Sequence, residues 1–328
     1  MNYEIRDCID AGTEYCPCHL AESGDCILCS QLCGKSFCDC VNWKGVCIYQ
    51  EYFWNGCKAK GERKSFLCRI IKKEIINDSY FMFHISVTHK MAQDLVHPGS
   101  YVFLRKEDTV AFYDTPISVM DVDLEENIIK VVIESKGIKT KELLTLNEND
   151  KVLLRGPYWN GVLGLKSIYK CRDSNVLLIA IGIGQAPLIP VMKKLYSNGN
   201  NIFVILDTVN YNDTFIQEYL NMCSAKVIQI PVLKKGQLTE EFKKLVKENI
   251  MKENIKLIHV DAQDIIIYEL LENVKNDEVK LTCCNNAKMC CGEGICGTCS
   301  VRYKGHVVKR LCKLQTEPEY IFKDRRLI

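Results

Sequence analysis

The sequence predicts a multidomain α+β fold with four parts in chain order. Three observations predict it: cysteines gather near both ends, short β-rich runs follow the first group, and strands alternate with helices beyond residue 166. The chain has 20 cysteines in 328 residues, with eleven in 1–68, two in 69–282 and seven in 283–328. We expect a cysteine-rich module over 1–68, an antiparallel β-barrel over 69–165, a doubly wound α/β domain over 166–282 and a second cysteine module over 283–328.

Composition and charge exclude several classes of protein. Charged residues make up 26% of the chain, hydrophobic residues make up 47%, and the net charge is +2. A nucleic-acid-binding protein would carry a basic excess, and a membrane span would need about 18 consecutive apolar residues, so neither nucleic acid nor membrane is expected as a partner. The first residues contain no apolar signal core, which predicts a cytoplasmic protein. In that reducing compartment, clustered cysteines bind metal more often than they form disulfides.

The N-terminal module is predicted to be irregular and to depend on a metal for folding, because glycines interrupt it about every ten residues. Cys26 and Cys29 form a C-x2-C pair and are the favoured ligands. Four thiolates hold one [4Fe–4S] cluster or one zinc ion, and we favour the cluster because a redox centre is also expected near the C-terminus. The candidate ligands are Cys16, Cys18, Cys26, Cys29, Cys38, Cys40 and Cys47, while Cys8, Cys57 and Cys68 are outliers.

Short runs rich in β-branched and aromatic residues follow this module. Turns separate them at regular spacing, which is typical of a small antiparallel barrel. The expected strands are 68–76, 80–87, 101–104, 117–120, 128–134 and 151–154.

The next part alternates between strands and helices, which predicts a parallel sheet. The continuous apolar run 175–181 indicates a buried strand, and a turn containing Gly182, Gly184, Ala186 and Pro187 follows it and opens a helix. In this setting the backbone can approach a dinucleotide pyrophosphate; an ordinary strand–helix turn that needs glycine for its geometry is the alternative. The further expected elements are strands 201–206, 226–230 and 256–260 and helices 187–196, 214–223, 240–249 and 265–274.

The C-terminal module carries the most specific motif in the chain. Cys291, Cys296 and Cys299 have the spacing C-x4-C-x2-C, and Cys312 supplies a fourth thiol. This is the plant-type [2Fe–2S] pattern, and the three glycines between the cysteines allow the backbone to wrap a cluster. A structural zinc site is the alternative, although such sites usually pair two C-x2-C knuckles.

Together these motifs resemble the ferredoxin–NADP reductase superfamily, in particular the electron-transfer subunits of dihydroorotate dehydrogenase. The small subunits of NADH-dependent ferredoxin:NADP oxidoreductase and of sulfide dehydrogenase are related. The resemblance covers about residues 69–328 and implies FAD on the barrel and a nicotinamide cofactor, NAD(P)H, at the glycine turn. The family's Arg-Pro-Ile/Phe-Ser motif corresponds here to Thr115, Pro116, Ile117 and Ser118. Its Gly-x-Gly-Thr motif corresponds to Gly137, Lys139 and Thr140, and the strand between the two motifs corresponds to Val132, Ile133 and Glu134.

Three positions depart from the family pattern. The family usually has arginine where this chain has Thr115, and often where it has Glu134; these arginines bind the flavin pyrophosphate. The family also usually has Cys-Gly-Pro after the last parallel strand, where this chain has residues 260–263. Two versions of the function therefore stay open: a working NAD(P)H-dependent reductase module, or a degenerate reductase that only conducts electrons and docks a partner.

The resemblance also implies partners. These are a catalytic flavoenzyme subunit of a heteromeric oxidoreductase and, as a further donor or acceptor, ferredoxin. No side chain is expected to act as an acid–base catalyst, because the flavin and nicotinamide carry the hydride chemistry. A colourless scaffold with two zinc sites is the alternative from another class.

Overall fold

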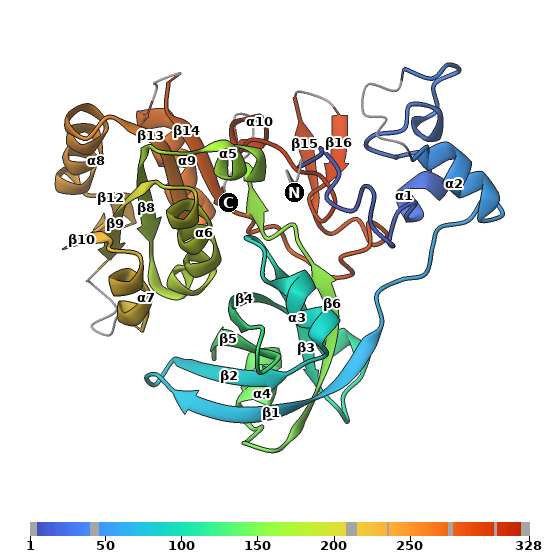
Figure 1. Ribbon diagram of the computed structural model, residues 1–328, viewed down its shortest axis with the longest axis horizontal. Helices are drawn as coiled ribbons and strands as arrows, with labels where there is room; N and C mark the ends of the chain where they lie inside the picture. Colours follow the sequence, from blue (N-terminus) through green and yellow to red (C-terminus); the bar gives the residue numbers. More distant parts are fainter. Residues whose placement is uncertain are drawn as a thin grey trace.

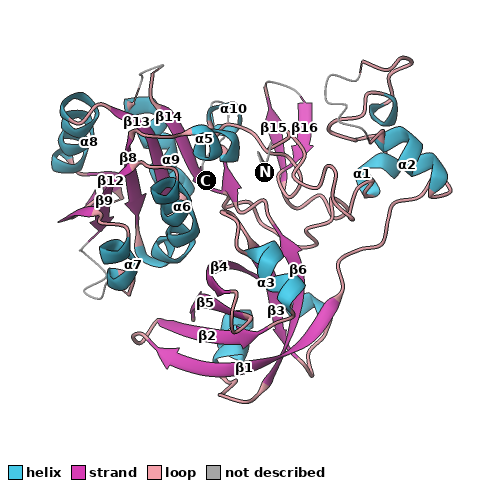
Figure 2. Ribbon diagram, in the orientation of Figure 1, coloured by secondary structure: helices cyan, strands magenta, loops and turns pink. Residues whose placement is uncertain are grey.

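The computed structural model describes residues 5–39, 46–207, 215–234, 236–274, 278–304 and 307–322. A barrel and an α/β domain form two bodies, and the two cysteine-rich segments lie together beside them (Figure 1). Figure 2 shows that these segments are mostly loop, whereas the barrel and the α/β domain are built from regular strands and helices.

The barrel is closed, with strand order β1-β2-β5-β4-β3-β6, and its neighbouring strands are antiparallel. Alternate residues of each strand point inward, so Phe81, Phe83 and Ile85 of one strand share a core with Val131 and Ile133 of the next. The strands are β1 (Ser65–Ile75), β2 (Tyr80–Ser86), β3 (Tyr101–Lys106), β4 (Thr115–Asp123), β5 (Ile128–Glu134) and β6 (Lys151–Tyr158), and the helices are α3 (His89–Leu95), η2 (Ala111–Tyr113) and α4 (Ile138–Leu144).

The α/β domain has strand order β10-β9-β8-β13-β14-β7, parallel except for β7. Helices α5, α6 and α7 cover one face and helices α8 and α9 cover the other, which confirms the doubly wound prediction. The strands are β7 (Val162–Leu163), β8 (Asn175–Ala180), β9 (Asn201–Asp207), β10 (Lys226–Ile230), β11 (Leu233–Lys234), β12 (Gln237–Leu238), β13 (Ile255–Asp261) and β14 (Lys280–Cys284). The helices are α5 (Leu165–Lys170), η3 (Gly182–Gly184), α6 (Gln185–Ser197), α7 (Gln217–Met222), α8 (Glu240–Lys252) and α9 (Asp264–Asn273).

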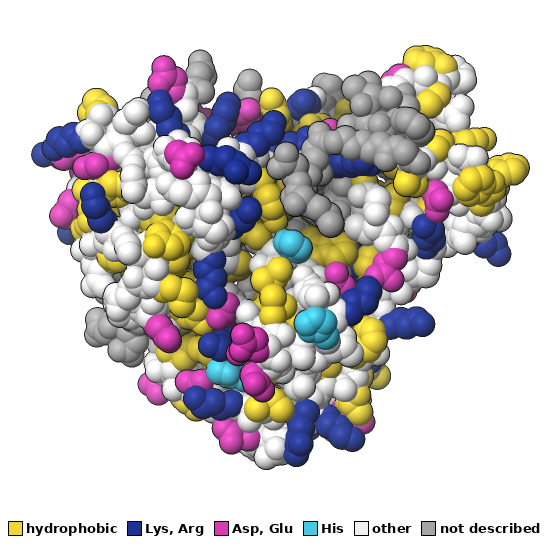
Figure 3. Space-filling view, viewed as in Figure 1, with side chains coloured by type: hydrophobic (Ala, Val, Ile, Leu, Met, Phe, Trp, Pro, Cys, Tyr) yellow, Lys and Arg dark blue, Asp and Glu magenta, His cyan; other side chains and the backbone are white. Residues whose placement is uncertain are grey.

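The two cysteine-rich segments contact each other directly. Cys8 pairs with Leu314 in an antiparallel bridge, so the first described residues lie against the chain that follows Cys312. Exposed apolar side chains, including Phe53 and Trp54 on α2, gather at the far end of the N-terminal segment, at the upper right of Figure 3. The elements are α1 (His19–Glu22), η1 (Gln31–Cys33), α2 (Ile48–Trp54), β15 (Ser300–Tyr303), β16 (Val307–Arg310) and α10 (Glu319–Phe322).

Three elements cross the expected boundaries between parts, and one of them is α5, which begins at Leu165. Strand β1 begins at Ser65, and β14 extends to Cys284, so the sheet continues without a break into the C-terminal cysteine loop. No helix within the described ranges is long and apolar enough to cross a membrane.

Candidate cofactor site

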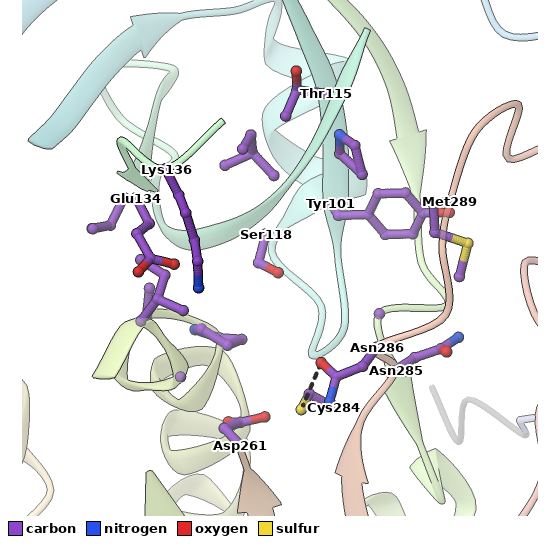
Figure 4. Close-up of a pocket in the computed structure, with 18 of the residues that line it drawn as sticks. Tyr101, Thr115, Ser118, Glu134, Lys136, Asp261, Cys284, Asn285, Asn286 and Met289 are labelled. Atoms are coloured by element: carbon purple, nitrogen blue, oxygen red, sulfur yellow. Dashed lines mark hydrogen bonds between the residues drawn. The ribbon is translucent and has the colours of Figure 1, made fainter. Parts of the chain in front are cut away.

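A cavity of about 1030 Å³ lies between the barrel and the α/β domain (Figure 4). Strands β4 and β5 and the start of α4 form its barrel side. The start of α6, the ends of β13 and β14 and the loop after β14 form the opposite side. This is where the carboxyl ends of parallel strands meet in an open α/β sheet, the usual position of a ligand site.

The structure brings twelve of the fourteen predicted cofactor-binding residues to this cavity. Ile133 and Gly182 do not line it. Ile133 points into the barrel core because residues of β5 alternate between the two faces, so only its neighbours Val132 and Glu134 face the cavity. Gly182 is buried inside the turn. The twelve are Thr115, Pro116, Ile117, Ser118, Val132, Glu134, Gly137, Lys139, Thr140, Gly184, Ala186 and Pro187.

The barrel side of the cavity is fixed by local hydrogen bonds. The Thr140 hydroxyl accepts hydrogen bonds from the backbone N–H groups of Lys136 (3.1 Å) and Gly137 (3.2 Å), which holds the turn that starts α4. The Thr115 hydroxyl donates to the carbonyl of Tyr113 over 2.9 Å, so its proton is already used. Thr140 and Thr115 therefore shape the cavity more than they offer free polar groups to it.

The cavity contains more positive charge than the loss of arginine at Thr115 and Glu134 alone would indicate. Lys136 and Lys139 line the cavity together with Glu134. The Lys139 ammonium lies 3.4 Å from the carbonyl of Asp114 and 4.5 Å from the ring centre of Phe112. Two lysines therefore bring positive charge to the side of the cavity where arginines are missing.

Gly184 has a clear packing role. A Cβ atom at this position would lie 2.1 Å from the carbonyl oxygen of Asp261. Only glycine lets the first turn of α6 lie this close to the end of β13. The geometric explanation of the turn thus accounts for Gly184, whether or not a phosphate binds there.

A buried polar chain ends at the cavity. His259 Nδ1 lies 2.9 Å from the Thr282 hydroxyl, and its Nε2 lies 3.1 Å from the Asp261 carboxylate. Asp261 is fully buried and lines the cavity, and its second carboxylate oxygen has no hydrogen-bond partner in the described part of the chain. The sequence singled out this position only as a missing glycine; the aspartate itself follows a predicted strand end, which is the signal that could have identified it.

Tyr101 is a cavity residue that the sequence reasoning missed. Its ring stacks on Tyr158 with 5.1 Å between ring centres and points toward Met289 (Figure 4). It is 4% exposed, and its hydroxyl has no hydrogen-bond partner among the described residues. Burial raises the pKa of this phenol well above its usual value, so it stays a hydrogen-bond donor. A buried donor without a partner at a cavity wall lowers the stability of the fold unless a ligand accepts a hydrogen bond from it.

The four C-terminal cysteines lie near one another as two pairs. Thiols of Cys291 and Cys296 form one hydrogen-bonded pair, and those of Cys299 and Cys312 form the other. Burial opposes ionisation of Cys296, but hydrogen bonds with Thr298 and then Cys291 lower its pKa to about 7. The hydrogen bond between Cys299 and Cys312 lowers the pKa of Cys299 to about 6 and raises that of Cys312. The intervening glycines at 292, 294 and 297 all have positive φ, as a tightly wound loop requires. This donor set fits an iron–sulfur cluster.

The N-terminal cysteines separate into two groups. Cys8, Cys16, Cys18 and Cys26 line one small cavity, so Cys8 is not an outlier. The backbone N–H of Cys29 donates to the sulfur of Cys26 over 3.4 Å, but Cys29 itself does not line this cavity. Neither do Cys38, which is exposed, and Cys47; Cys40 lies outside the described residues.

The side chains of these four cysteines are partly buried. Burial raises the pKa of Cys16 to about 12 and raises those of Cys8, Cys18 and Cys26. All described cysteines are free thiols. In the described ranges, no group of three or more His, Cys, Asp or Glu side chains is already arranged to hold a metal ion.

Four buried charges join the two cysteine-rich segments. Asp10 accepts from Arg63 over 2.7 Å and from Lys313 over 2.5 Å, and Glu293 lies 3.0 Å from Arg63 and 3.2 Å from Lys313. The positive partners lower the pKa of Asp10 to about 2 and also lower that of Glu293. Glu293 also accepts from the Tyr158 hydroxyl over 2.9 Å. This ion network (Asp10, Arg63, Glu293 and Lys313) could not be read from spacing, because its members are far apart in sequence.

The chain is similar in sequence to known electron transfer subunits. No family model matches it. It is 26% identical over 218 residues to the dihydroorotate dehydrogenase B (NAD(+)) electron transfer subunit of Clostridium acetobutylicum, covering 66% of this chain and 82% of the relative. It is 27% identical over 248 residues to a homologue of that subunit in Thermotoga maritima, covering 74% and 82%.

Solved structures agree on the fold. A chain of the NADH-dependent reduced ferredoxin-NADP oxidoreductase superposes with a TM-score of 0.65 and 23% identity, covering 78% of this chain and 90% of that one. A mutant ferredoxin-NADP+ reductase from Plasmodium falciparum gives a TM-score of 0.52 and 14% identity, covering 67% and 96%. The resemblance expected from the motifs is therefore confirmed: the chain is similar to dihydroorotate dehydrogenase B electron transfer subunits and has the fold of ferredoxin–NADP reductases.

Proposed function

We propose that this chain is an iron–sulfur flavoprotein subunit that passes electrons between NAD(P)H or ferredoxin and a partner flavoenzyme subunit. FAD is the cofactor of the cavity between the barrel and the α/β domain, and Cys291, Cys296, Cys299 and Cys312 hold a [2Fe–2S] cluster. When bound, FAD supplies the ability to accept two electrons as a hydride and to release them one at a time. The protein contributes binding, placement and shielding from water.

One observation carries this proposal: the flavin-motif residues and the glycine turn, which lie on two separate bodies, line the same cavity. A two-cofactor site needs both sets to face one space, because hydride transfer requires the reacting atoms to be in contact. The buried Tyr101 hydroxyl offers an unused donor there. Residues 115–118 and the start of α4 would hold the flavin, with Lys136 and Lys139 in place of the family's arginines.

The cavity also adjoins the cysteine loop. Met289 lines it, and Cys291 follows two residues later. The Cys291 carbonyl accepts a hydrogen bond from Arg155 of β6 over 2.9 Å, which ties the start of the loop to the barrel. An electron leaving the cavity therefore has a short covalent path to the proposed cluster.

A second version of the function is favoured by one residue. Asp261 places a buried, partly unpaired carboxylate where the family has Cys-Gly-Pro. A side chain at this position removes the close backbone approach that glycine allows, so in this version the chain binds flavin and conducts electrons without taking a hydride from NAD(P)H.

Flavin, iron and sulfide content of anaerobically purified protein, followed by titration with NADH and NADPH, tests the proposal. We expect a flavin absorption band that is bleached by one of the two nucleotides. A stable flavin band that neither nucleotide bleaches would select the conduit version. Protein without flavin and without iron, carrying two zinc ions, would overturn both versions and support the scaffold alternative.

A further inference from the structure

We propose that Cys8, Cys16, Cys18 and Cys26 form a thiolate metal site that is seated against the C-terminal cysteine loop. The sequence left seven candidate ligands in this module, and Cys8 was not among them. The geometry selects a different set of four. Binding of metal here is independent of flavin binding; only a role in electron transfer rests on the function proposed above.

The four cysteines surround one enclosed space. They line the same small cavity from three separate stretches of chain, and the other lining side chains are almost all apolar, among them Leu20, Ala21 and Ile48. The one charged lining residue, Asp10, is already engaged by Arg63 and Lys313. The available donors are therefore four sulfur atoms, in partly buried and mostly apolar surroundings.

This donor chemistry limits the metal. Four thiolates select thiophilic centres, either zinc or iron, the latter as a single ion or with inorganic sulfide. Each cysteine has a single side-chain torsion before its sulfur, and rotation about this torsion has to bring the sulfurs together, because the described residues contain no ready-formed metal site. When no metal is bound, a small irregular module of this kind has little other structure to stabilise its fold.

Buried charges of both signs lie next to the proposed site. Arg63 and Lys313 are buried near the Cys8 segment, and Lys313 favours the thiolate form of Cys18. Asp10 and Glu293 pair with both cations and act on Cys18 with the opposite sign. The ion network therefore fixes the position of the site against the C-terminal loop, and its charges balance one another.

The site lies close to the C-terminal cysteines. Ile9 donates its backbone N–H to the carbonyl of Lys313 over 2.9 Å, and Cys8 pairs with Leu314. Cys312 is two residues before Leu314, in the turn that leads to this bridge. On the other side of the loop, a Cβ at Gly294 would lie 3.1 Å from Leu20, between Cys18 and Cys26 in the sequence. The two metal sites are thus neighbours, which suits a second carrier in one electron path.

Metal analysis of variants tests the ligand set. Iron, zinc and acid-labile sulfide per chain are measured in anaerobically purified protein carrying Cys8→Ser or Cys26→Ser, with Cys33→Ser, an exposed cysteine of the same module, as matched control. We expect both ligand variants to lose one complete centre while the control and the reduced [2Fe–2S] EPR signal persist. Loss of one zinc or one iron identifies a single ion, and loss of iron with equal sulfide identifies a cluster.

Contrary outcomes are equally clear. Full metal retention in Cys8→Ser, or loss of the same centre in Cys47→Ser, would overturn the ligand set. If a variant does not fold, anomalous scattering at the iron and zinc edges from crystals of the unsubstituted chain decides: a peak among the four sulfurs supports the site, and its absence there, or a disulfide between two of them, refutes it. Because these readouts do not involve flavin, they can fail or succeed separately from the proposed function.

Discussion

Arg63 and Glu293 form a buried ion pair with 3.0 Å between Nη1 and Oε2, although 230 residues separate them in the sequence. Arg63 lies just before β1, and Glu293 lies in the loop between Cys291 and Cys296. The guanidinium also lies 3.9 Å from the ring centre of Tyr15 and 4.5 Å from that of Tyr158. One side chain thus contacts the N-terminal module, the barrel and the cysteine loop.

Replacement of this arginine tests the ion network. Arg63→Met leaves Asp10 and Glu293 buried with Lys313 as their remaining cation, and we expect the free energy of unfolding to fall by about 3–5 kcal/mol. Urea unfolding followed by circular dichroism measures this. Lys35→Met, which breaks an exposed pair with Asp39, is the control and should leave the unfolding midpoint unchanged. Equal effects of the two substitutions would contradict a special role for the buried network.

Gly184→Ala tests the contact between α6 and β13. The added methyl would overlap the Asp261 carbonyl, so the helix must move, at a cost of about 1–3 kcal/mol. Thermal unfolding should shift downward, and bound flavin should be released more readily because the cavity wall moves. Gly61→Ala, which meets no atom within 4 Å, provides the comparison. An unchanged transition in the Gly184 variant would show that the turn tolerates a side chain.

Tyr101→Phe tests whether the unpaired hydroxyl serves the flavin. Removing a buried donor without a partner should leave the stability of the flavin-free protein unchanged or slightly higher. If the hydroxyl donates to FAD, the dissociation constant should rise roughly 2- to 12-fold, the equivalent of one hydrogen bond of about 0.5–1.5 kcal/mol. Flavin fluorescence titration measures this constant. Tyr268→Phe on α9, which does not line the cavity, should not change it, and an unchanged constant in the Tyr101 variant would rule out the contact.

Cys296→Ser tests the proposed [2Fe–2S] ligands. Removing one thiolate of four should abolish the EPR signal of the reduced cluster. Cys290→Ser is a close control, because Cys290 is exposed and lies outside the C-x4-C-x2-C spacing. Retention of the signal in the Cys296 variant, or its loss in the Cys290 variant, would require a different ligand set.

Most of the regular structure could be predicted from the sequence. The expected strands and helices of both bodies are present with small shifts at their ends, because alternating and continuous apolar runs report directly on burial. Short elements such as β7 and α4 were missed, since two to seven residues carry too little periodicity.

The site was predictable only where chemistry is encoded locally. Motif residues such as Pro116 and Gly184 do line the cavity, whereas Tyr101 and Asp261 reach it through the packing of one body on the other. Cys8 is an outlier in the sequence pattern, yet it pairs with Leu314 and lines the same cavity as Cys16, Cys18 and Cys26. Contacts between distant segments leave no trace in spacing.

The pairing of Cys8 and Asp10 with residues 313–314 has a consequence for biosynthesis. Asp10 and Lys313 are 303 residues apart, so the first leaves the ribosome long before its partner exists. The barrel and the α/β domain can fold as they emerge, but the N-terminal segment must wait, with Cys8 unpaired, until Lys313 and Leu314 have been made. Metal loading of this segment is therefore expected to be a late, post-translational step, and nascent chains halted before residue 313 should lack it.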